Sequence, residues 1–471
     1  MLEICILYFY AGFSSALSER PASHSVQEHL PISIIPDDSS PLYSPDDHMM
    51  QCSRLIKSPF QKIDLLFSQK KCIFISELYY CITMISRNLA ATLKSRASQY
   101  PVVTVTGPRQ SGKTTLCRAC FPEKPYSNLE RPDNREFAIS DPAGYLSQFP
   151  LGAVIDEIQR VPELLSWIQT RVDEHNRAGE FILTGSHQFE LNRHISQSLA
   201  GRTALCTLLP LSIAEIHAYG ALTGIDRLLY AGGYPRIHAD ALDPAVALGD
   251  YFATYVERDL RELINLRNIR QFELFVRLAA GRTGQLLNMH SLAADTGISS
   301  VTAREWLSLL EASYIIFLLP PWFANIGKRL TKSPKLYFCD VGLAAWLMGI
   351  REESHLNVHP LKGQLFENLV VLELMKGLLN QGKHPQLNFY RDSSGLEADL
   401  VFEEGDGLVV TEIKSGRTVS GEAFASLHKT RKILGERVKK VYLVYGGNES
   451  QKRSDTEVLS YLESSNIVTQ H

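Results

Sequence analysis

A ten-residue segment, GPRQSGKTTL at positions 107–116, fits the pattern G-x-x-x-x-G-K-[ST] at each fixed position. Loops of this kind bind phosphate, because the glycines let successive backbone N–H groups face phosphate oxygens and the following helix adds its positive end. The Lys113 ammonium is expected to contact the β- and γ-phosphates, and the Thr114 hydroxyl to coordinate Mg²⁺. The predicted nucleotide-binding loop consists of Gly107, Pro108, Arg109, Gln110, Ser111, Gly112, Lys113, Thr114 and Thr115.

Two adjacent acidic residues form the second part of this chemistry. In GAVIDEIQ (152–159) an apolar run ends in Asp156 and Glu157. Parallel sheets bind their ligands at the carboxyl ends of the strands, where these side chains are expected to lie. Asp156 is predicted to complete the Mg²⁺ shell, and Glu157 to orient and deprotonate the attacking water. The acid pair and the loop together predict hydrolysis of a nucleoside triphosphate.

Ser186 and Arg202 are further candidates for the same catalytic site. Ser186 ends the segment EFILTGS (180–186), where it is expected either to hydrogen-bond the water or γ-phosphate or simply to form a turn. Arg202 precedes a predicted strand. An arginine that reaches a transition-state phosphate contributes roughly 10³ to 10⁵ in rate. The alternative for Arg202 is a salt bridge at the surface or at an interface.

A second group of charged residues lies near the C-terminus. Asp399 is expected on one strand of a hairpin, and Glu412 and Lys414 on the other. Side chains alternate along a strand, so Glu412 and Lys414 share a face. With Glu367 from a preceding helix, such carboxylates and a lysine could bind a divalent cation and activate water for phosphodiester cleavage. The alternative is a hairpin whose solvent-exposed face carries alternating charges.

The elements that position these residues predict an α/β fold. Short apolar runs at 102–106, 152–159, 180–186 and 203–210 alternate with helical patterns, as in a parallel sheet with crossover helices. Residues 290–320 have the order helix, turn, helix, strand, which is typical of a winged helix-turn-helix. Because Glu305 and Glu311 accompany Arg304 on the second helix, helix packing is the alternative to DNA binding.

The chain divides by composition into five predicted segments. Residues 31–50 are rich in Pro, Ser and Asp, which indicates a disordered extension. Either the functional chain begins near Met84 or residues 1–83 are a dispensable extension. The predicted boundaries are 1–83 for this extension, 84–220 for the nucleotide-binding domain, 221–350 for a helical winged-helix-like region, 351–455 for a second α/β domain, and 456–471 for a tail.

Composition limits the classes of partner. The 471 residues carry a net charge of −3, so contact with nucleic acid requires a local basic patch, and KRLTKSPK (328–335) and KTRKILGERVKK (429–440) are the candidates. No apolar run reaches the ~18 residues of a membrane span. Eight cysteines without paired spacing predict reduced thiols and a cytoplasmic location. Cys117 and Cys120 are predicted to pack within a helix rather than to bind zinc.

Several segments resemble a large prokaryotic family of AAA-like ATPases that carry a C-terminal domain of unknown function. They are GPRQSGKTTL, YSNLERPDNREFAISDPAGYL, VIDEIQRVPEL, FILTGSHQFEL with SLAGR, LPLSIAEI and GGYPR. The resemblance covers about residues 85–450. It implies ATP as the nucleotide, a strand added between the two nucleotide motifs, and a homo-oligomer as one possibility. Lys113, Thr114, Asp156 and Glu157 match the ATPase motifs, and Ser186 and Arg202 match them less closely.

The C-terminal order Glu, Asp, Glu-x-Lys resembles the PD-(D/E)XK nuclease superfamily. Ala398 stands where the superfamily name has Pro. The resemblances imply an ATPase whose cycle acts on a nuclease-like module that faces DNA or RNA. The alternatives are a nucleotide-dependent switch or scaffold for a protein partner, and a nuclease in which ATP is only structural.

Overall fold

The computed structural model describes residues 85–186, 198–220, 224–257, 269–323, 333–453 and 455–469. The chain separates into two units, Met1–Ile73 and Phe74–His471, and every described residue belongs to the second. The predictions for residues 1–83, and for residues 328–332 of the first basic segment, lie outside the described residues. Among the helices that the structure describes, none is long and apolar enough to cross a membrane.

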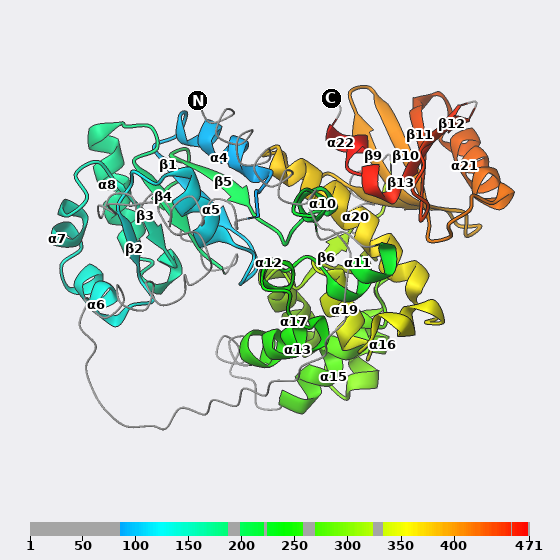
Figure 1. Ribbon diagram of the computed structural model, residues 1–471, viewed down its shortest axis with the longest axis horizontal. Helices are drawn as coiled ribbons and strands as arrows, with labels where there is room; N and C mark the ends of the chain where they lie inside the picture. The colour runs from blue at the N-terminus through cyan, green and yellow to red at the C-terminus, as the bar shows by residue number, and fades with distance from the viewer. Residues whose placement is uncertain are drawn as a thin grey trace, which may run out of the picture. The chain divides into compact units, whose positions relative to one another are not determined.

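The first part of the fold is a five-stranded parallel sheet (Figure 1). Its order is β2-β3-β4-β1-β5, so that β4 lies between the strand before the phosphate loop and the strand before the acid pair. The three central strands β3, β4 and β1 are buried along their whole length, which explains their mainly apolar sequences. The strands are β1 (Val102–Thr106), β2 (Tyr126–Asn128), β3 (Ala153–Asp156), β4 (Phe181–Thr184) and β5 (Thr203–Thr207).

Helices cover both faces of this sheet (Figure 1). One face packs against α4 (Leu89–Ala97) and α5 (Lys113–Cys120). The other packs against α6 (Pro132–Ser140), α7 (Pro142–Ser147) and α8 (Leu164–His175). Cys117 and Cys120 are buried free thiols in α5, which confirms the predicted helix packing. The short helices η1 (Ile158–Arg160) and α10 (Ile213–Ala218) follow β3 and β5.

The middle region is mainly helical, as predicted. Trp306 of its helix α17 packs edge-on against Phe272 and Phe275 of α15, with ring centroids 5.2 and 5.3 Å apart. One face of α17 is therefore used for helix packing. The elements are α11 (Ile225–Ala231), α12 (Pro235–Ala239), α13 (Pro244–Tyr251), η2 (Phe252–Glu257), α15 (Ile269–Ala280), α16 (Met289–Thr296), α17 (Ser300–Ala312), β6 (Ile316–Leu319), β7 (Lys335–Phe338), α19 (Val341–Leu347) and η3 (Glu353–Asn357).

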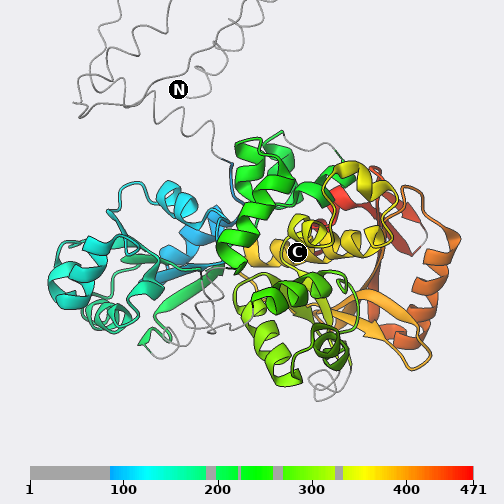
Figure 2. The ribbon, with the colours of Figure 1, turned by 90° about the horizontal axis from the view of Figure 1, so that it is seen from below.

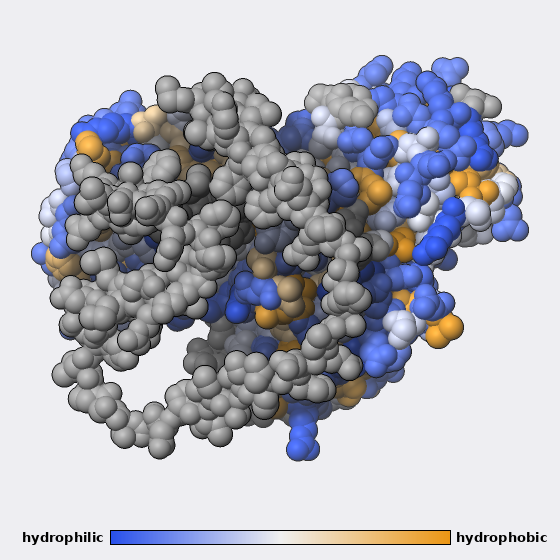
Figure 3. All heavy atoms as spheres, in the orientation of Figure 1, coloured by the Kyte–Doolittle hydropathy of each residue, from blue (hydrophilic) through white to orange (hydrophobic). Residues whose placement is uncertain are grey.

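A six-stranded mixed sheet, ordered β12-β13-β11-β10-β9-β8, forms the C-terminal part. Strands β9 and β10 form the predicted hairpin, and β10 and β11 are parallel because α21 crosses between them. Figure 3 shows a mainly hydrophilic surface over this part, with hydrophobic residues scattered among polar ones. The elements are α20 (Lys362–Asn380), β8 (Asn388–Arg391), β9 (Glu397–Glu404), β10 (Gly407–Lys414), α21 (Gly421–Leu434), η4 (Gly435–Arg437), β11 (Val438–Tyr445), β12 (Gln451–Arg453), β13 (Thr456–Ser460), η5 (Tyr461–Glu463) and α22 (Asn466–Thr469).

Helix α20 joins the two sheets. It contacts strand β5 of the first sheet, helix α4 that covers this sheet, and strand β10 of the second sheet. Figure 2 shows this yellow-to-orange helix between the two sets of strands. Lys376 donates from Nζ to the Leu211 carbonyl at 2.8 Å, and a Glu373 oxygen accepts from the Ile213 amide at 2.8 Å. Lys376 and Glu373 are buried and also form an ion pair with each other. Buried polar groups with hydrogen-bond partners therefore stabilise the contact between α20 and the segment after β5.

Candidate functional site

The phosphate loop follows β1, and its turn depends on two glycines. Gly107 has φ +143°, and a Cβ there would lie 2.1 Å from the Leu208 carbonyl oxygen. Gly112 has φ +92° and is the residue before α5. A side chain at Gly107 would collide with the backbone of Leu208, the residue after β5. The close contact between the loop and the end of β5 therefore requires glycine at this position. All the loop residues of the prediction therefore lie where β1 ends and α5 begins.

Lys113 is held inside this loop. Its side chain is buried, and Nζ donates to the carbonyl oxygens of Gly107 and Pro108 at 3.0 and 2.8 Å. Burial lowers the pKa of Lys113 to about 8, although the nearby Glu157 and Asp156 carboxylates oppose the shift. A phosphate would give this ammonium the anionic partner that neutral carbonyls do not supply.

Asp156 lies at the carboxyl end of β3 and is surrounded by hydroxyl groups. Its carboxylate accepts from the Thr114 hydroxyl at 2.9 Å, from the Tyr126 hydroxyl at 2.7 Å, and from Thr184. A buried carboxylate beside a threonine hydroxyl is a set of hard oxygen donors of the kind that Mg²⁺ takes, together with phosphate oxygens and waters. The structure thus brings together the two residues predicted to hold Mg²⁺.

Glu157 has an unusual backbone conformation for a residue with a side chain. Its φ and ψ are 57° and 46°, in the left-handed region, which turns the chain sharply after β3. The Glu157 carboxylate accepts from Gln159 and, at 3.2 Å, from the Ser186 hydroxyl. Ser186 therefore lies at the predicted site, where its contact is with Glu157. Gln159 was not predicted, although it belongs to the same DEIQ segment.

The prediction that Arg202 reaches the phosphates is wrong for the pocket of its own chain. Val102 pairs with Thr203, so Arg202 lies at the amino end of β5 while the phosphate loop follows the carboxyl end of β1. Five strand residues separate these edges by roughly 15 Å. Arg202 instead pairs with Asp173 of α8 through two nitrogen–oxygen contacts of 2.5 and 2.8 Å. The salt-bridge alternative describes this contact.

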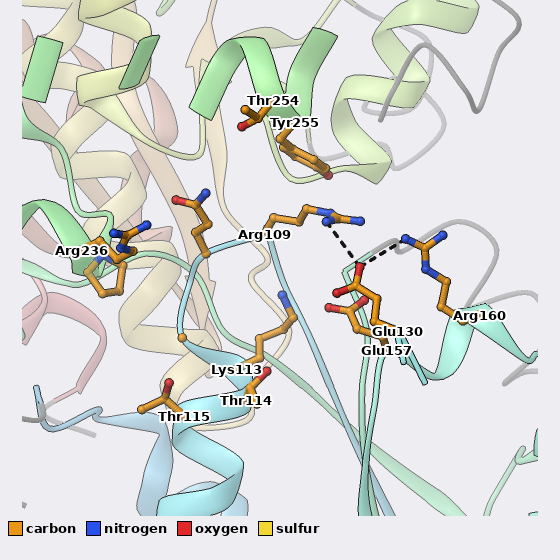
Figure 4. A pocket seen from close by; sticks show the side chains of 13 residues that line it. Arg109, Lys113, Thr114, Thr115, Glu130, Glu157, Arg160, Arg236, Thr254 and Tyr255 are labelled. Carbon is orange, nitrogen blue, oxygen red and sulfur yellow. Dashed lines mark hydrogen bonds and ion pairs between the residues drawn. The ribbon is translucent and has the colours of Figure 1, made fainter. Parts of the chain in front are cut away.

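A cavity of about 720 Å³ opens beside the loop (Figure 4). Arg160 and Arg109 both approach Glu130, at 3.2 and 3.9 Å, opposite Lys113. Several residues of the middle region close the other side, and none of them was assigned a role from the sequence. Arg236 could have been found from the sequence, because it ends GGYPR, one of the segments that resemble the ATPase family. The unassigned lining residues include Glu130, Arg160, Pro235, Arg236, Thr254 and Tyr255.

Arg87 supports the loop from behind. Its buried guanidinium donates to the Ser111 carbonyl at 2.5 Å and to the Leu209 carbonyl at 2.6 Å. It also pairs with Glu215 at 3.1 Å, and Glu215 completes a capping box with Ser212 at the start of α10. The phosphate loop and α10 are therefore held by one buried ion pair.

Replacing Arg87 with Met is expected to destabilise the fold by about 3–5 kcal/mol, because Glu215 would remain buried without its counter-ion. The matched control is Arg131→Met, whose partner Asp133 lies with it on the surface and where the expected change is close to zero. The midpoint of urea unfolding, followed by circular dichroism on the full chain, measures both. Equal midpoints for the two variants would contradict a supporting role for Arg87.

The structure also brings together the C-terminal candidates. Asp399 of β9 accepts from the Ile413 amide at 2.8 Å, and Lys414 pairs with Glu412 at 2.6 Å on β10. The pKa values of Glu367 and Glu412 are raised to about 7, mainly because the two carboxyl groups are buried and secondly because Asp399 repels their charge. Three carboxylates from α20, β9 and β10 thus share one partly buried region. In the described parts of the chain, however, no three His, Cys, Asp or Glu side chains are placed to hold a metal ion.

Lys335 and Tyr337 belong to the same cluster and were not predicted. Lys335 Nζ lies 2.9 Å from Glu367 and also contacts Glu397, and the Tyr337 hydroxyl donates to Glu367 at 2.5 Å. The sequence placed Lys335 in a basic segment that would touch a nucleic-acid backbone. That expectation is wrong for this residue, because its side chain is buried among carboxylates.

The second basic segment lies on α21 and the start of β11. Three of its side chains have acidic partners: Arg431 pairs with Asp455, Lys440 with Glu404 at 2.8 Å, and Arg437 with Glu403 at 3.9 Å. Lys429, Lys432 and Lys439 are exposed. A solvated helix face accounts for this arrangement, and contact with nucleic acid stays a prediction.

The loop, the acid pair and the five-stranded sheet define an AAA-type P-loop ATPase domain, a class that binds nucleotides. Residues 99–217 match a family model described as an AAA domain. Residues 222–354 match a domain of unknown function, DUF8612, and residues 362–464 match another, DUF4143.

The chain belongs to the same family as the mycobacterial protein described as "Uncharacterized protein Rv2008c". It is 32% identical to that Mycobacterium tuberculosis protein over 382 residues, which cover 80% of this chain and 84% of the relative. "Uncharacterized protein MJ1544" of Methanocaldococcus jannaschii is 25% identical over 277 residues, or 54% of this chain and 59% of that protein. Among solved structures, the Walker-type ATPase PABY2304 of Pyrococcus abyssi matches with a TM-score of 0.38 and 17% identity, over 56% of this chain and 96% of that one.

Proposed function

We propose that the protein binds ATP with Mg²⁺ at the phosphate loop and hydrolyses it. The single observation that carries the proposal is the convergence of Lys113, Thr114, Asp156 and Glu157 at the edge of one parallel sheet. When bound, Mg²⁺ would neutralise charge on the β- and γ-phosphates. Thr114 and Asp156 are the residues that would hold it. A homo-oligomer and a cytoplasmic location stay predictions.

Each side chain then has a defined task. Lys113 leaves the loop carbonyls and pairs with the phosphates, which lie against the backbone of residues 107–112. Glu157 orients the attacking water and accepts its proton, while Gln159 and Ser186 hold the Glu157 carboxylate in place. Arg236, which lines the cavity from α12, adds a cation on the side of the middle region.

The experiment is the release of inorganic phosphate from Mg²⁺·ATP by the purified full chain, with and without a panel of DNA and RNA. Turnover that nucleic acid stimulates supports an ATPase acting on a nucleic-acid-facing module. Turnover indifferent to the whole panel favours the nucleotide-dependent switch or scaffold for a protein partner. Absence of any turnover would contradict the proposal.

The C-terminal cluster supports a second candidate function, cation-dependent cleavage of a phosphodiester. The observation that favours it is the order helix, three antiparallel strands, helix, strand, in which Glu367, Asp399, Glu412 and Lys414 meet on α20, β9 and β10. One oxygen of Glu412 is buried without a hydrogen-bond partner, as expected of a carboxylate that takes a cation. The winged helix-turn-helix predicted for residues 290–320 would supply a contact with DNA.

Asp399→Asn is expected to reduce Mn²⁺-dependent nicking of plasmid DNA or cleavage of RNA by at least about 100-fold, because a carboxylate that holds the cation is lost. The matched control is Asp406→Asn, at the exposed turn of the same hairpin, which should cleave as the parent does. Gel assays with EDTA blanks measure the rates. If the parent cleaves none of the substrates, the second candidate function is wrong.

A further inference from the structure

A cation of the chain itself lies among the C-terminal carboxylates. Lys335 is on β7 of the middle region, outside the hairpin and α20, and its side chain is only 3% exposed. Its Nζ lies 2.9 Å from Glu367 Oε1 and 4.0 Å from Asp399 Oδ1, and it also contacts Glu397. The middle region therefore supplies the counter-ion of a site that the C-terminal domain builds.

Even with Lys335 in place, the carboxylates of the cluster outnumber its cations. Glu367, Glu397, Asp399 and Glu412 face Lys335 and Lys414, and Arg391 reaches Glu397 from outside at 3.3 Å. Four carboxylates thus face three cations. In addition, Glu412 is 5% exposed, and its Oε2 is buried with no hydrogen-bond partner. This buried, unpaired carboxylate oxygen would give a further cation a ligand.

Lys335 and Lys414 differ in how freely they can make room for that cation. The Lys414 side chain is 44% exposed and can swing into solvent. The Lys335 side chain is enclosed, with the Phe389 ring centroid 5.5 Å from Nζ and Tyr337 sharing its partner Glu367. A divalent ion bound to Glu367 and Asp399 would lie a few ångströms from the Lys335 ammonium, where repulsion between like charges is strong.

We propose that Lys335 controls the cation affinity of the C-terminal acidic site, because a divalent cation must compete with its ammonium for Glu367 and Asp399. The inference rests on the second proposed function, that this site takes a divalent cation. Lys335 itself would not touch the substrate; it would act through the carboxylates that hold the cation. The middle region thereby sets whether the C-terminal carboxylates are neutralised by the chain or by a metal ion.

The test is Mn²⁺ binding to the nucleotide-free full chain, measured by electron paramagnetic resonance of free Mn²⁺. All proteins carry Lys113→Ala so that the phosphate loop holds no nucleotide. Lys335→Met should bind Mn²⁺ more tightly than this parent, on the order of tenfold or more, since a competing charge is gone. Lys335→Arg keeps the charge and should bind as the parent does. Adding Glu412→Gln to Lys335→Met should remove most of the gain.

Lys335→Met leaves its carboxylates without a counter-ion, so its fold must be checked by circular dichroism. Should it not fold, the double variant Lys335→Met with Glu397→Gln removes one charge of each sign, and a several-fold gain in Mn²⁺ affinity is still expected because the position is vacated. If the parent binds Mn²⁺, and a folded variant without Lys335 binds it no more tightly, the proposed role of Lys335 is wrong. If no protein in the set binds Mn²⁺, the cation site itself, and with it the second proposed function, is wrong.

Discussion

Lys113→Ala is expected to weaken ATP binding strongly. In the structure the Lys113 ammonium is buried, and its partners at 3.0 and 2.8 Å are neutral carbonyls of the loop, so its full charge is available to a phosphate. Removing one partner of a buried charge pair costs about 2–5 kcal/mol. The Kd should therefore rise by about 30-fold to several thousandfold. Isothermal titration calorimetry with Mg²⁺ and a slowly hydrolysed ATP analogue measures the change.

Lys124→Ala is the matched control for this experiment. Lys124 precedes β2, and its Nζ donates to the carbonyls of Leu151 and Glu180 at 3.3 and 3.2 Å, at the amino ends of the strands. Its loss should leave the affinity for the analogue unchanged. A folded Lys113→Ala protein that binds as tightly as the parent would show that phosphate does not bind in this loop.

The nucleotide site was predictable because local sequence determines most of it. A loop that must turn tightly needs Gly107 and Gly112, and a buried parallel strand needs a continuous apolar run, so both features are visible without a structure. The position of Asp156 and Glu157 at the end of such a strand follows from the direction of the sheet. The short strand β2 has only three residues and was missed, although its Tyr126 contacts Asp156.

The residues that were misassigned depend on contacts between distant segments. Arg202 follows a motif-like segment, but the parallel register of β1 and β5 puts it at the wrong edge of the sheet. Lys335 belongs to a basic segment, which predicts exposure, yet β7 carries it into an acidic cluster built by residues from 367 to 412. Neither periodicity nor spacing in the sequence predicts which groups the end of a long charged side chain contacts, because its acidic partners lie far along the chain.

Buried polar contacts connect the nucleotide pocket with the C-terminal cluster. The Gly233 amide, three residues before Arg236, donates to the buried Asp340 carboxylate at 2.7 Å, and Asp340 follows the strand that carries Lys335. On the other side Glu373 of α20 binds the start of α10, which Arg87 ties to the phosphate loop. A shift of either site breaks buried hydrogen bonds unless the neighbouring elements move with it. ATP turnover and the C-terminal chemistry are therefore best measured in the same intact chain.

Glu157→Gln is expected to bind ATP within a few-fold of the parent but to lose turnover. The amide keeps the size of the side chain and can still meet Gln159 and Ser186, whereas it cannot accept a proton from water. Loss of a positioned general base lowers kcat by about 10²- to 10⁴-fold. Phosphate release under saturating Mg²⁺·ATP gives kcat, and calorimetry on the same preparation gives the affinity.

Glu163→Gln is the matched control, since Glu163 is exposed just before α8 and carries the same substitution outside the pocket. It should hydrolyse ATP at the parent rate. Normal turnover by Glu157→Gln would remove Glu157 as the base. Loss of both turnover and binding would mean instead that the left-handed turn at this residue, with φ 57°, holds the loop and the acid pair in place. The two measurements together separate a chemical role from a structural one, because loss of a group that acts only in the transition state lowers kcat and leaves the affinity intact.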